Sequence, residues 1–251
     1  MTTGVVIIPV RGIGEVAAGD DVAALIGRAL AADGQALCDG DIIVVTQKIV
    51  SKAEGRLIDP ATVEPSHLAQ MAAVHGAKDA RHYEVVLRES RRVVRMDRGV
   101  LITETHHGFI CANAGVDESN VGGGQWLTLL PVDPDASARR ICDALCAASG
   151  ATVAVVISDT FGRAWREGQV NVAIGVAGML PLHDYAGQPD AYGYTMHVTN
   201  IAVADELASA AELVMGKVDA VPVALIRGYR YRAGDGSARA LVRAPERDLF
   251  R

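Results

Sequence analysis

Two short apolar runs constrain the fold of this 251-residue chain more than any other feature. Residues 42–46 (Ile-Ile-Val-Val-Thr) and 152–157 (Thr-Val-Ala-Val-Val-Ile) are almost continuously apolar. A strand with one face in water alternates polar and apolar residues, so continuous runs of this length are typical of strands buried on both faces. Half of the residues are hydrophobic but only 4% are aromatic, which predicts an aliphatic core around these strands.

Helical and strand patterns alternate along the chain, but several predicted strands follow one another directly. Helices are predicted over 20–32, with Asp20 as the N-cap, and over 66–75, 79–89, 135–148 and 205–215. Further strands are predicted over 5–10, 92–94, 100–103, 109–112, 170–177 and 221–226. This order indicates an α/β fold of the mixed α+β kind, neither Rossmann nor P-loop. We expect a single domain over 1–251 whose tail, 233–251, is loosely ordered.

Charge and cysteine content exclude several classes of protein. The formal net charge is −6, which argues against general nucleic-acid binding because that requires a basic surface. No apolar stretch reaches the about 20 residues of a membrane span, and no signal-peptide pattern begins the chain. No metal-binding spacing occurs among Cys38, Cys111, Cys142 and Cys146. We therefore expect a cytoplasmic protein with neither nucleic-acid nor membrane partners.

Two acidic positions follow predicted strands and suggest a shared site. Asp117 lies in a polar loop after the strand 109–112, and Asp159 follows the apolar run 152–157. Magnesium usually takes one or two protein carboxylates and completes its shell with substrate phosphates, so this pair suits it. Taken singly, each aspartate is better explained as a turn-forming residue. Taken together, they favour a metal site at which both strands end.

The neighbouring residues strengthen the interpretation of the pair as a metal site. Thr160 and Asn120 add a hydroxyl and an amide oxygen, which hard cations accept as ligands. Arg163 and Arg166 lie close to Asp159 in the sequence and are suited to neutralising phosphate charge. The sequence therefore predicts a site for a metal ion together with a phosphate group.

Two segments are candidate nucleotide contacts. Residues 12–17 (Gly-Ile-Gly-Glu-Val-Ala) match the dinucleotide pattern G-x-G-x-x-G/A, but the following helix starts too late for a Rossmann site. A plain loop and a differently built nucleotide loop both remain open for this segment. Residues 46–52 (Thr-Gln-Lys-Ile-Val-Ser-Lys) follow a buried strand with two lysines that suit phosphate oxygens. Two solvated lysines explain that pattern equally well.

Three segments together carry a family resemblance. They are Val-Ser-Lys-Ala-Glu-Gly-Arg at 50–56, His-Gly-Phe-Ile-Cys-Ala-Asn-Ala-Gly-Val-Asp-Glu-Ser-Asn at 107–120 and Ser-Asp-Thr-Phe-Gly-Arg at 158–163. On these residues the chain resembles the coenzyme F-420 γ-glutamyl ligase family. The resemblance implies an enzyme that uses GTP to add L-glutamate to a deazaflavin coenzyme precursor. It also implies a divalent cation (Mg or Mn), the monovalent cation K and a homodimer; we expect no nitroreductase-like domain of the kind that some members carry.

The resemblance further implies roles for individual residues. Asp117 and Asp159 match catalytic residues that are divalent-metal ligands, and Thr160 matches a ligand of a second ion. Contacts to GTP are implied for Ile13, Gly14, Glu15, Val16, Gln47, Lys52 and Asn120. The chain departs from the family pattern at residues 13 and 14, where Leu-Pro is usual, and glycine is more flexible there than proline.

The implied reaction solves a chemical problem, because an amine does not displace oxygen from a free carboxylate at a useful rate. Phosphoryl transfer from GTP would activate the precursor's carboxylate as an acyl phosphate, which glutamate then attacks. GDP and phosphate are released. Two other functions could use the same residues. One is a metal-dependent nucleotide phosphohydrolase, in which water replaces the carboxylate, and the other is a non-catalytic deazaflavin- or nucleotide-binding protein.

Overall fold

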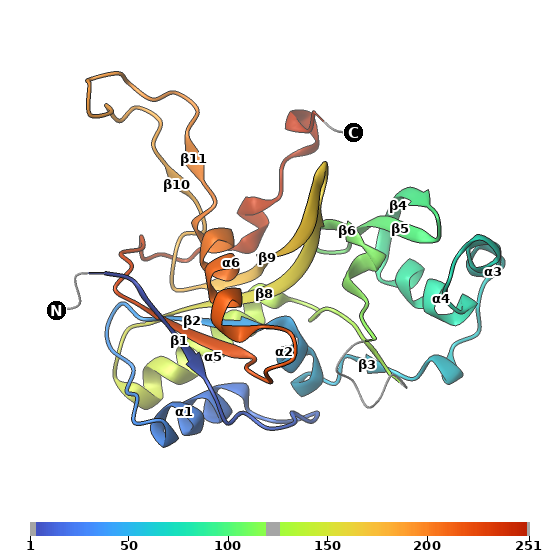
Figure 1. The fold of residues 1–251 in the computed structure, drawn as a ribbon, viewed down its shortest axis with the longest axis horizontal. Coiled ribbons are helices and arrows are strands. Elements are labelled where there is room, and N and C mark those ends of the chain that lie inside the picture. Colours follow the sequence, from blue (N-terminus) through green and yellow to red (C-terminus); the bar gives the residue numbers. More distant parts are fainter. Residues whose placement is uncertain (1–3, 119–125, 250–251) are drawn as a thin grey trace.

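A five-stranded mixed sheet forms the centre of the computed structural model, which describes residues 4–118 and 126–249 (Figure 1). Its strands lie in the order β1 (Val6–Val10), β12 (Val223–Arg227), β2 (Ile42–Thr46), β8 (Ala154–Arg163) and β9 (Arg166–Ala177). Strands β2 and β8 are parallel, and the other neighbours are antiparallel. The prediction of a mixed α/β fold is therefore confirmed. No helix within the described ranges has the length and apolar character needed to cross a membrane.

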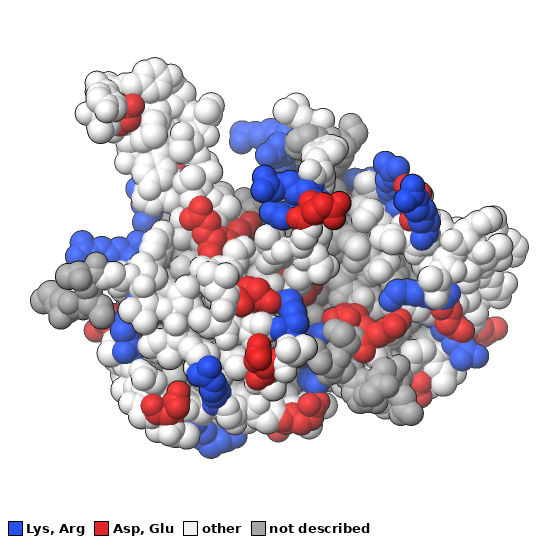
Figure 2. All heavy atoms as spheres, viewed as in Figure 1, with Lys and Arg blue, Asp and Glu red and all other residues white. Residues whose placement is uncertain are grey.

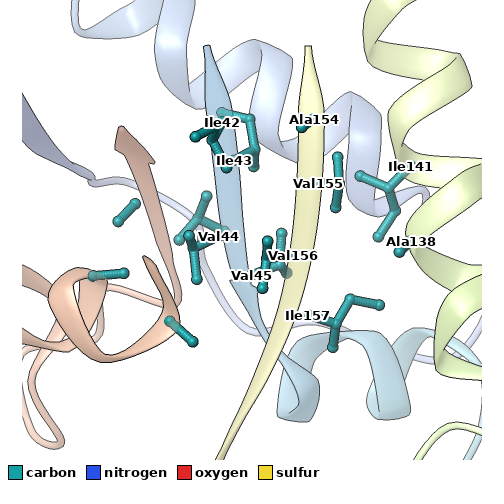
Figure 3. Close-up of a cluster of buried hydrophobic side chains, with 14 of the residues drawn as sticks. Ile42, Ile43, Val44, Val45, Ala138, Ile141, Ala154, Val155, Val156 and Ile157 are labelled. Atoms are coloured by element: carbon teal, nitrogen blue, oxygen red, sulfur yellow. The ribbon is translucent and has the colours of Figure 1, made fainter. Parts of the chain in front are cut away.

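The two apolar runs lie at the centre of this sheet and are buried on both faces, as predicted. Residues 42–45 of β2 and 154–157 of β8 are all 0% exposed. Helices α1 (Val22–Ala32) and α5 (Pro134–Ser149) cover one face, and α6 (Val203–Met215) covers the other (Figure 1). Figure 3 shows Ala138 and Ile141 of α5 beside Val155 of β8. Close aliphatic packing on both sides makes the sheet a rigid support for side chains at its edge.

Helix α5 is fixed at both ends and anchors the C-terminal segment. Asp133 caps its first turn with a 3.0 Å hydrogen bond, and Gly150 ends it in the left-handed conformation with φ of 73°. The buried Asp135 carboxylate accepts bonds from Val176 N of β9 and from Ala238 N, both at 2.9 Å. Composition indicated a loosely ordered tail, yet Ala238 is only 1% exposed because Asp135 offers its backbone a buried partner.

A second hydrophobic cluster lies beside the main sheet, at the right of Figure 1. It includes residues of helices α3 (His67–His75) and α4 (Ala80–Arg88) and of β5 (Val100–Thr105), the middle strand of a sheet with β4 (Ser90–Asp97) and β6 (Ile110–Ala112). Tyr83, Val86 and Leu101 fill its centre and are at most 2% exposed. Because β6 leads toward Asp117, this cluster supports one half of the candidate site.

Short elements complete the described chain. Strand β3 (Leu57–Ile58) pairs with β7 (Leu127–Thr128), and β10 (His183–Asp184) pairs with β11 (Asn200–Ile201) at the base of a projecting arm (Figure 1). The 3-10 helices are η1 (Pro60–Thr62), η2 (Asn113–Gly115), η4 (Ala238–Leu241) and η5 (Pro245–Arg247). Acidic and basic side chains are interspersed over the face seen in Figure 2, so neither sign of charge dominates it.

One local prediction before the second apolar run was wrong, and one helix was not predicted. Asp21, not Asp20, caps α1, because the Asp20 carboxylate accepts a hydrogen bond from Ala17 N at 2.8 Å and closes the preceding turn. The polar segment after β2, for which the sequence predicted no helix, is the helix α2 (Gln47–Ala53). Burial of one face of this helix outweighs its polar composition, since Val50 is 2% exposed.

Gly175 tests how closely α5 packs on β9. A Cβ at this position would lie 2.3 Å from Pro134 O, a backbone atom that cannot move without shifting the helix. Overpacking of this kind costs about 1–3 kcal/mol, so we expect Gly175→Ala to lower the free energy of unfolding by that amount. Gly162→Ala on β8 is the matched control, because its Cβ would meet no atom within 4 Å. Urea denaturation giving equal stabilities for the two variants would contradict this packing.

Candidate active site

Asp159 and Thr160 lie on β8 just beyond the part of the strand that is buried in the core. The strand was predicted to end at residue 157, but it continues to Arg163 because β9 pairs with it along this length (Figure 1). A register shift between Ile157 and Ser158 marks the change, and Asp159 and Thr160 are half-buried. The Asp159 carboxylate thus lies at the rim of the core, where its Oδ1 accepts a hydrogen bond from Thr160 N at 2.8 Å.

Asp117 is held by a strained turn and by a backbone pair. The turn η2 before it has three successive residues with positive φ, 52° at Asn113, 53° at Ala114 and 72° at Gly115. Such conformations are unfavourable for residues other than glycine and persist only where surrounding contacts hold them. Asp117 N donates to Thr128 O at 3.1 Å, and Thr128 N donates to Asp117 O at 2.8 Å. The backbone from which the Asp117 carboxylate projects is therefore fixed.

The fold brings the two predicted aspartates into electrostatic range of each other. Burial and, to a smaller extent, the negative charge of Asp117 raise the pKa of the Asp159 carboxyl to about 6. The hydrogen bond from Thr160 N and the positive charges of Lys48 and Lys217 act in the opposite direction. Lys48 Nζ lies 2.7 Å from Asp117 Oδ2. Two carboxylates and two lysines therefore share this part of the molecule.

The donor set fits one divalent cation. Within the described residues, Asp159 accepts a backbone hydrogen bond but forms no direct ion pair, so a cation would relieve both its desolvation and its repulsion from Asp117. Magnesium and manganese accept carboxylate oxygens, and magnesium needs only one or two of them when phosphates and water complete its shell. No group of three or more His, Cys, Asp or Glu side chains suited to a metal occurs in residues 4–118 and 126–249. Substrate oxygens would have to supply the remaining ligands.

Thr160, predicted as a ligand of a second ion, already contacts a positive charge. Its Oγ1 accepts a hydrogen bond from Lys217 Nζ at 2.8 Å and donates one to Asn171 Oδ1 at 2.7 Å. Lys217 Nζ also lies 2.9 Å from Glu212 Oε1. An ammonium group therefore already occupies the oxygens around Thr160, and its positive charge opposes the binding of a second metal ion there.

The loop before α1 has one buried and one exposed side. Ile13 and Val16 are 7% and 4% exposed and anchor the loop in the core, which leaves Gly14 and Glu15 at the surface. Glu15 Oε1 lies 2.5 Å from Lys52 Nζ at the end of α2. Two residues with implied GTP contacts, Glu15 and Lys52, are thus brought together.

Two further implied GTP contacts, Gln47 and Asn120, are not joined to this pair in the part of the chain that the structure describes. Gln47 is 2% exposed, and its Oε1 accepts a hydrogen bond from Ser51 Oγ at 2.8 Å within α2. Its amide therefore faces the protein interior. Asn120 lies outside the described residues, so its contact with GTP stays a prediction from the sequence.

Comparison with known proteins identifies the family. The family model described as F420-0:Gamma-glutamyl ligase matches residues 12–228. The chain belongs to this family. Similar relatives are the coenzyme F420:L-glutamate ligases of Methanothermobacter thermautotrophicus (49% identical over 99% of both chains), Methanopyrus kandleri (45%, over 93% of this chain and 92% of the relative) and Methanocaldococcus jannaschii (44%, over 85% of each).

The contacts of two site lysines in this γ-glutamyl ligase family member could be identified only from the fold. Lys48 was one of two lysines considered for phosphate binding, and the structure pairs it with Asp117 instead. Lys217 follows Gly216, the glycine that ends α6, and nothing local distinguishes it from a solvated surface residue. Its contact with Thr160 spans distant parts of the sequence, so no spacing could have predicted it.

A buried histidine supports the loop beside Asp117 in this ligase. His82 Nδ1 lies 2.6 Å from Glu118 Oε1, and Lys78 Nζ lies 3.2 Å from the same oxygen. Burial and then the charge of Lys78 lower the pKa of His82 to about 4, so the imidazole is neutral near pH 7. These contacts hold Glu118 and thereby the residue next to the Asp117 carboxylate.

The two arginines proposed to neutralise phosphate are not beside Asp159 within this chain. Arg163 and Arg166 pair at the tip of the β8–β9 hairpin, and Arg163 Nη2 donates to Glu167 O at 2.6 Å. Arg163 lies four residue positions beyond Asp159 on an extended strand, which corresponds to about 13 Å. Cys111 does lie near Asp159, but burial and then the Asp159 charge raise the pKa of its thiol to about 12. A thiol held protonated in this way is a poor nucleophile.

Proposed function

We propose that this family member joins L-glutamate to the coenzyme F420 precursor in a reaction that consumes GTP and needs a divalent cation, Mg or Mn. The observation that carries the proposal is the pair Asp117 and Asp159, with Lys48 and Lys217 beside it, in a chain of the γ-glutamyl ligase family. The names of three relatives support the amino acid and the coenzyme. The nucleotide and the metal are inferred from the resemblance and from the chemistry of the site.

The proposed reaction has two steps that share one phosphoryl group. A carboxylate oxygen of the precursor attacks the γ-phosphorus of GTP, which forms an acyl phosphate and releases GDP. The amino nitrogen of glutamate then attacks the acyl carbon, loses a proton and expels phosphate. The expelled phosphate keeps the oxygen that came from the precursor, and the amide is the product. Positioning and charge neutralisation are the main contributions that a protein can make to such transfers.

The residues of the site can supply both positioning and charge neutralisation. Asp117 and Asp159 would hold the divalent cation, which neutralises phosphate charge when bound. Lys48 holds the Asp117 carboxylate in place by a 2.7 Å ion pair. Lys48 and Lys217 also place fixed positive charge near Asp159, where negative charge would gather during transfer.

Lys52 is a candidate contact for the nucleotide, and Lys52→Met should weaken GTP binding by about 10- to 100-fold because a charge-assisted contact to phosphate is lost. Its ammonium is already oriented by Glu15 at 2.5 Å. Glu15→Gln is the informative partner variant, since it breaks the same ion pair but leaves the lysine free for phosphate. Isothermal titration should then show GTP affinity reduced by Lys52→Met and kept or increased by Glu15→Gln. Equal losses in both variants would mean that the ion pair only supports the loop.

Product masses test the proposed function as a whole. Purified protein is incubated with the F420 precursor, L-glutamate, GTP and manganese, and the products are followed by mass spectrometry. We expect products that exceed the precursor by one or more glutamate residues, only when all four components are present. Phosphate release from GTP without precursor or glutamate would favour the phosphohydrolase, and tight binding without turnover would favour the binding protein. Either result would contradict the proposal.

A further inference from the structure

The ammonium of Lys217 lies within a cluster of oxygens contributed by two strands and a helix. Its Nζ is 2.8 Å from Thr160 Oγ1 on β8, 3.4 Å from Asn171 Oδ1 on β9 and 2.9 Å from Glu212 Oε1 on α6. Hydroxyl, amide and carboxylate oxygens are the groups that also surround hard metal ions in proteins. The chain therefore surrounds its own cation with the ligands that a free cation would need.

Hydrogen bonds among these oxygens fix the way they face Lys217. Asn171 is 2% exposed, and its Nδ2 donates to Glu212 Oε2 at 2.8 Å, which leaves its Oδ1 on the side of the lysine. Thr160 Oγ1 donates its hydrogen to the same Oδ1 at 2.7 Å, so its lone pairs are free to accept from Nζ. The oxygen cluster is thus oriented toward a cation by hydrogen bonds that do not involve the cation itself.

We propose that the Lys217 ammonium replaces the second cation, divalent or monovalent, expected at Thr160, so that this site of the ligase holds one divalent ion. The proposal rests on the proposed function for the reaction that this charge serves, whereas the ion count can be measured without turnover. Lys217 also lies within electrostatic range of Asp159, so the tethered charge acts on the same carboxylate as the bound metal ion.

The alternative explanation is that Lys217 forms a simple surface ion pair with Glu212. That explanation accounts for only one of the three contacts of Lys217. Lys217 and Glu212 have side chains that are 57% and 25% exposed, and exposed pairs of this kind contribute little to stability. That explanation covers the contact with Glu212, which is near in sequence. It does not explain why the same Nζ reaches Thr160 and Asn171 at the edge of the candidate site. It also implies that Lys217 can be replaced without loss of fold, which makes the variants below practical.

Two measurements on the wild-type protein test the ion count. Manganese is titrated into protein saturated with GDP, and free Mn²⁺ is followed by electron paramagnetic resonance. We expect one bound ion per chain. Ligation is then compared in chloride salts of potassium, sodium and tetramethylammonium at equal ionic strength, and we expect rates that agree within about twofold, because a tethered ammonium cannot be exchanged for a free ion. Two bound manganese ions, or a rate that requires potassium, would overturn the proposal.

Lys217→Met removes the charge but keeps an unbranched side chain. The oxygen cluster then lacks its cation, so we expect turnover in tetramethylammonium to fall by about tenfold or more. Added potassium should restore part of the lost turnover. Thermal melting supplies a second readout: potassium should raise the melting temperature of Lys217→Met but not that of wild type. Arg139→Met is the matched control. It removes a positive charge on α5 that forms an exposed ion pair with Asp235. It should behave as wild type does in every salt.

The outcomes separate the two proposals. If wild type forms no glutamate adduct but binds one manganese ion, and only Lys217→Met is stabilised by potassium, the proposed function fails and the role of Lys217 stands. If ligation proceeds but Lys217→Met shows neither a loss of turnover nor a response to potassium, the role of Lys217 fails and the ligase stands. Should Lys217→Met not fold, the ion count and the salt series on wild type still decide.

Discussion

Asp159→Asn is expected to abolish ligation, with a loss of about 10³-fold or more, and at the same time to stabilise the metal-free protein near pH 8. Activity is lost because a neutral amide is a weaker ligand for a hard cation than a carboxylate is. Stability rises because the wild-type carboxylate is ionised in a desolvated place without a direct ion pair in the described chain. The amide keeps the size of the side chain and its ability to accept the bond from Thr160 N.

The pH dependence of this stabilisation follows from the raised pKa. The folded chain holds the proton of Asp159 up to about pH 6, whereas the unfolded chain releases it near 3.8. Between these values the folded state binds more protons than the unfolded state, so wild-type stability falls as pH rises through this window and stays lower above it. The advantage of Asp159→Asn should therefore grow from pH 5 to pH 8 and reach the order of 2 kcal/mol.

Urea denaturation of wild type and Asp159→Asn at both pH values, with chelator present, measures this difference. Asp143→Asn is the control, because Asp143 is an exposed aspartate on α5 and its replacement should change neither stability nor turnover. An Asp159→Asn variant that is less stable than wild type at pH 8 would contradict the electrostatic description of the site. Retained ligation in that variant would remove Asp159 from the metal site.

Asp117→Asn is expected to cause a similar loss of ligation, about 10³-fold, for a related reason. It removes the second carboxylate of the pair and leaves Lys48 without the partner that lies 2.7 Å away. The two variants should differ in stability, because the Asp117 side chain is 42% exposed and ion-paired, so its replacement brings no gain.

Steady-state turnover and manganese binding in the presence of GDP measure the effect of Asp117→Asn. We expect weaker metal binding in parallel with the lost turnover, and circular dichroism should confirm the native fold. Turnover within about tenfold of wild type would show that Asp117 is not a metal ligand. Asp143→Asn serves again as the control, since Asp143 is an exposed aspartate on α5.

Much of the scaffold could be predicted from local patterns. The apolar runs at 42–46 and 152–157 gave the two parallel central strands because continuous burial leaves a clear signal. Ser66 and Asp79 cap helices where a short polar side chain precedes a helical pattern. The helix α2 was missed because its polar residues resembled a strand end, and only tertiary burial reveals its apolar face.

The site could be predicted only in part, for a different physical reason. The family resemblance and the predicted strand ends brought Asp117 and Asp159 together as candidates, and the fold places them in electrostatic range. The partners of these residues are set by packing between distant segments. Lys48 contacts Asp117 and Lys217 contacts Thr160 across the fold, and no spacing rule connects such pairs. Arg163 shows the converse, since it is near Asp159 in sequence but extends away along the strand.

Oxygen transfer from the precursor tests the central claim most directly, because activation of a carboxylate by GTP at the Asp117–Asp159 site moves one oxygen atom. The precursor is prepared with ¹⁸O in its terminal carboxylate and incubated with wild-type protein, GTP, L-glutamate and manganese. The released phosphate is then examined by mass spectrometry. We predict one ¹⁸O atom in the phosphate released by the first addition of glutamate and one retained in the new amide. Phosphate free of ¹⁸O, alongside glutamate addition, would contradict the acyl-phosphate route.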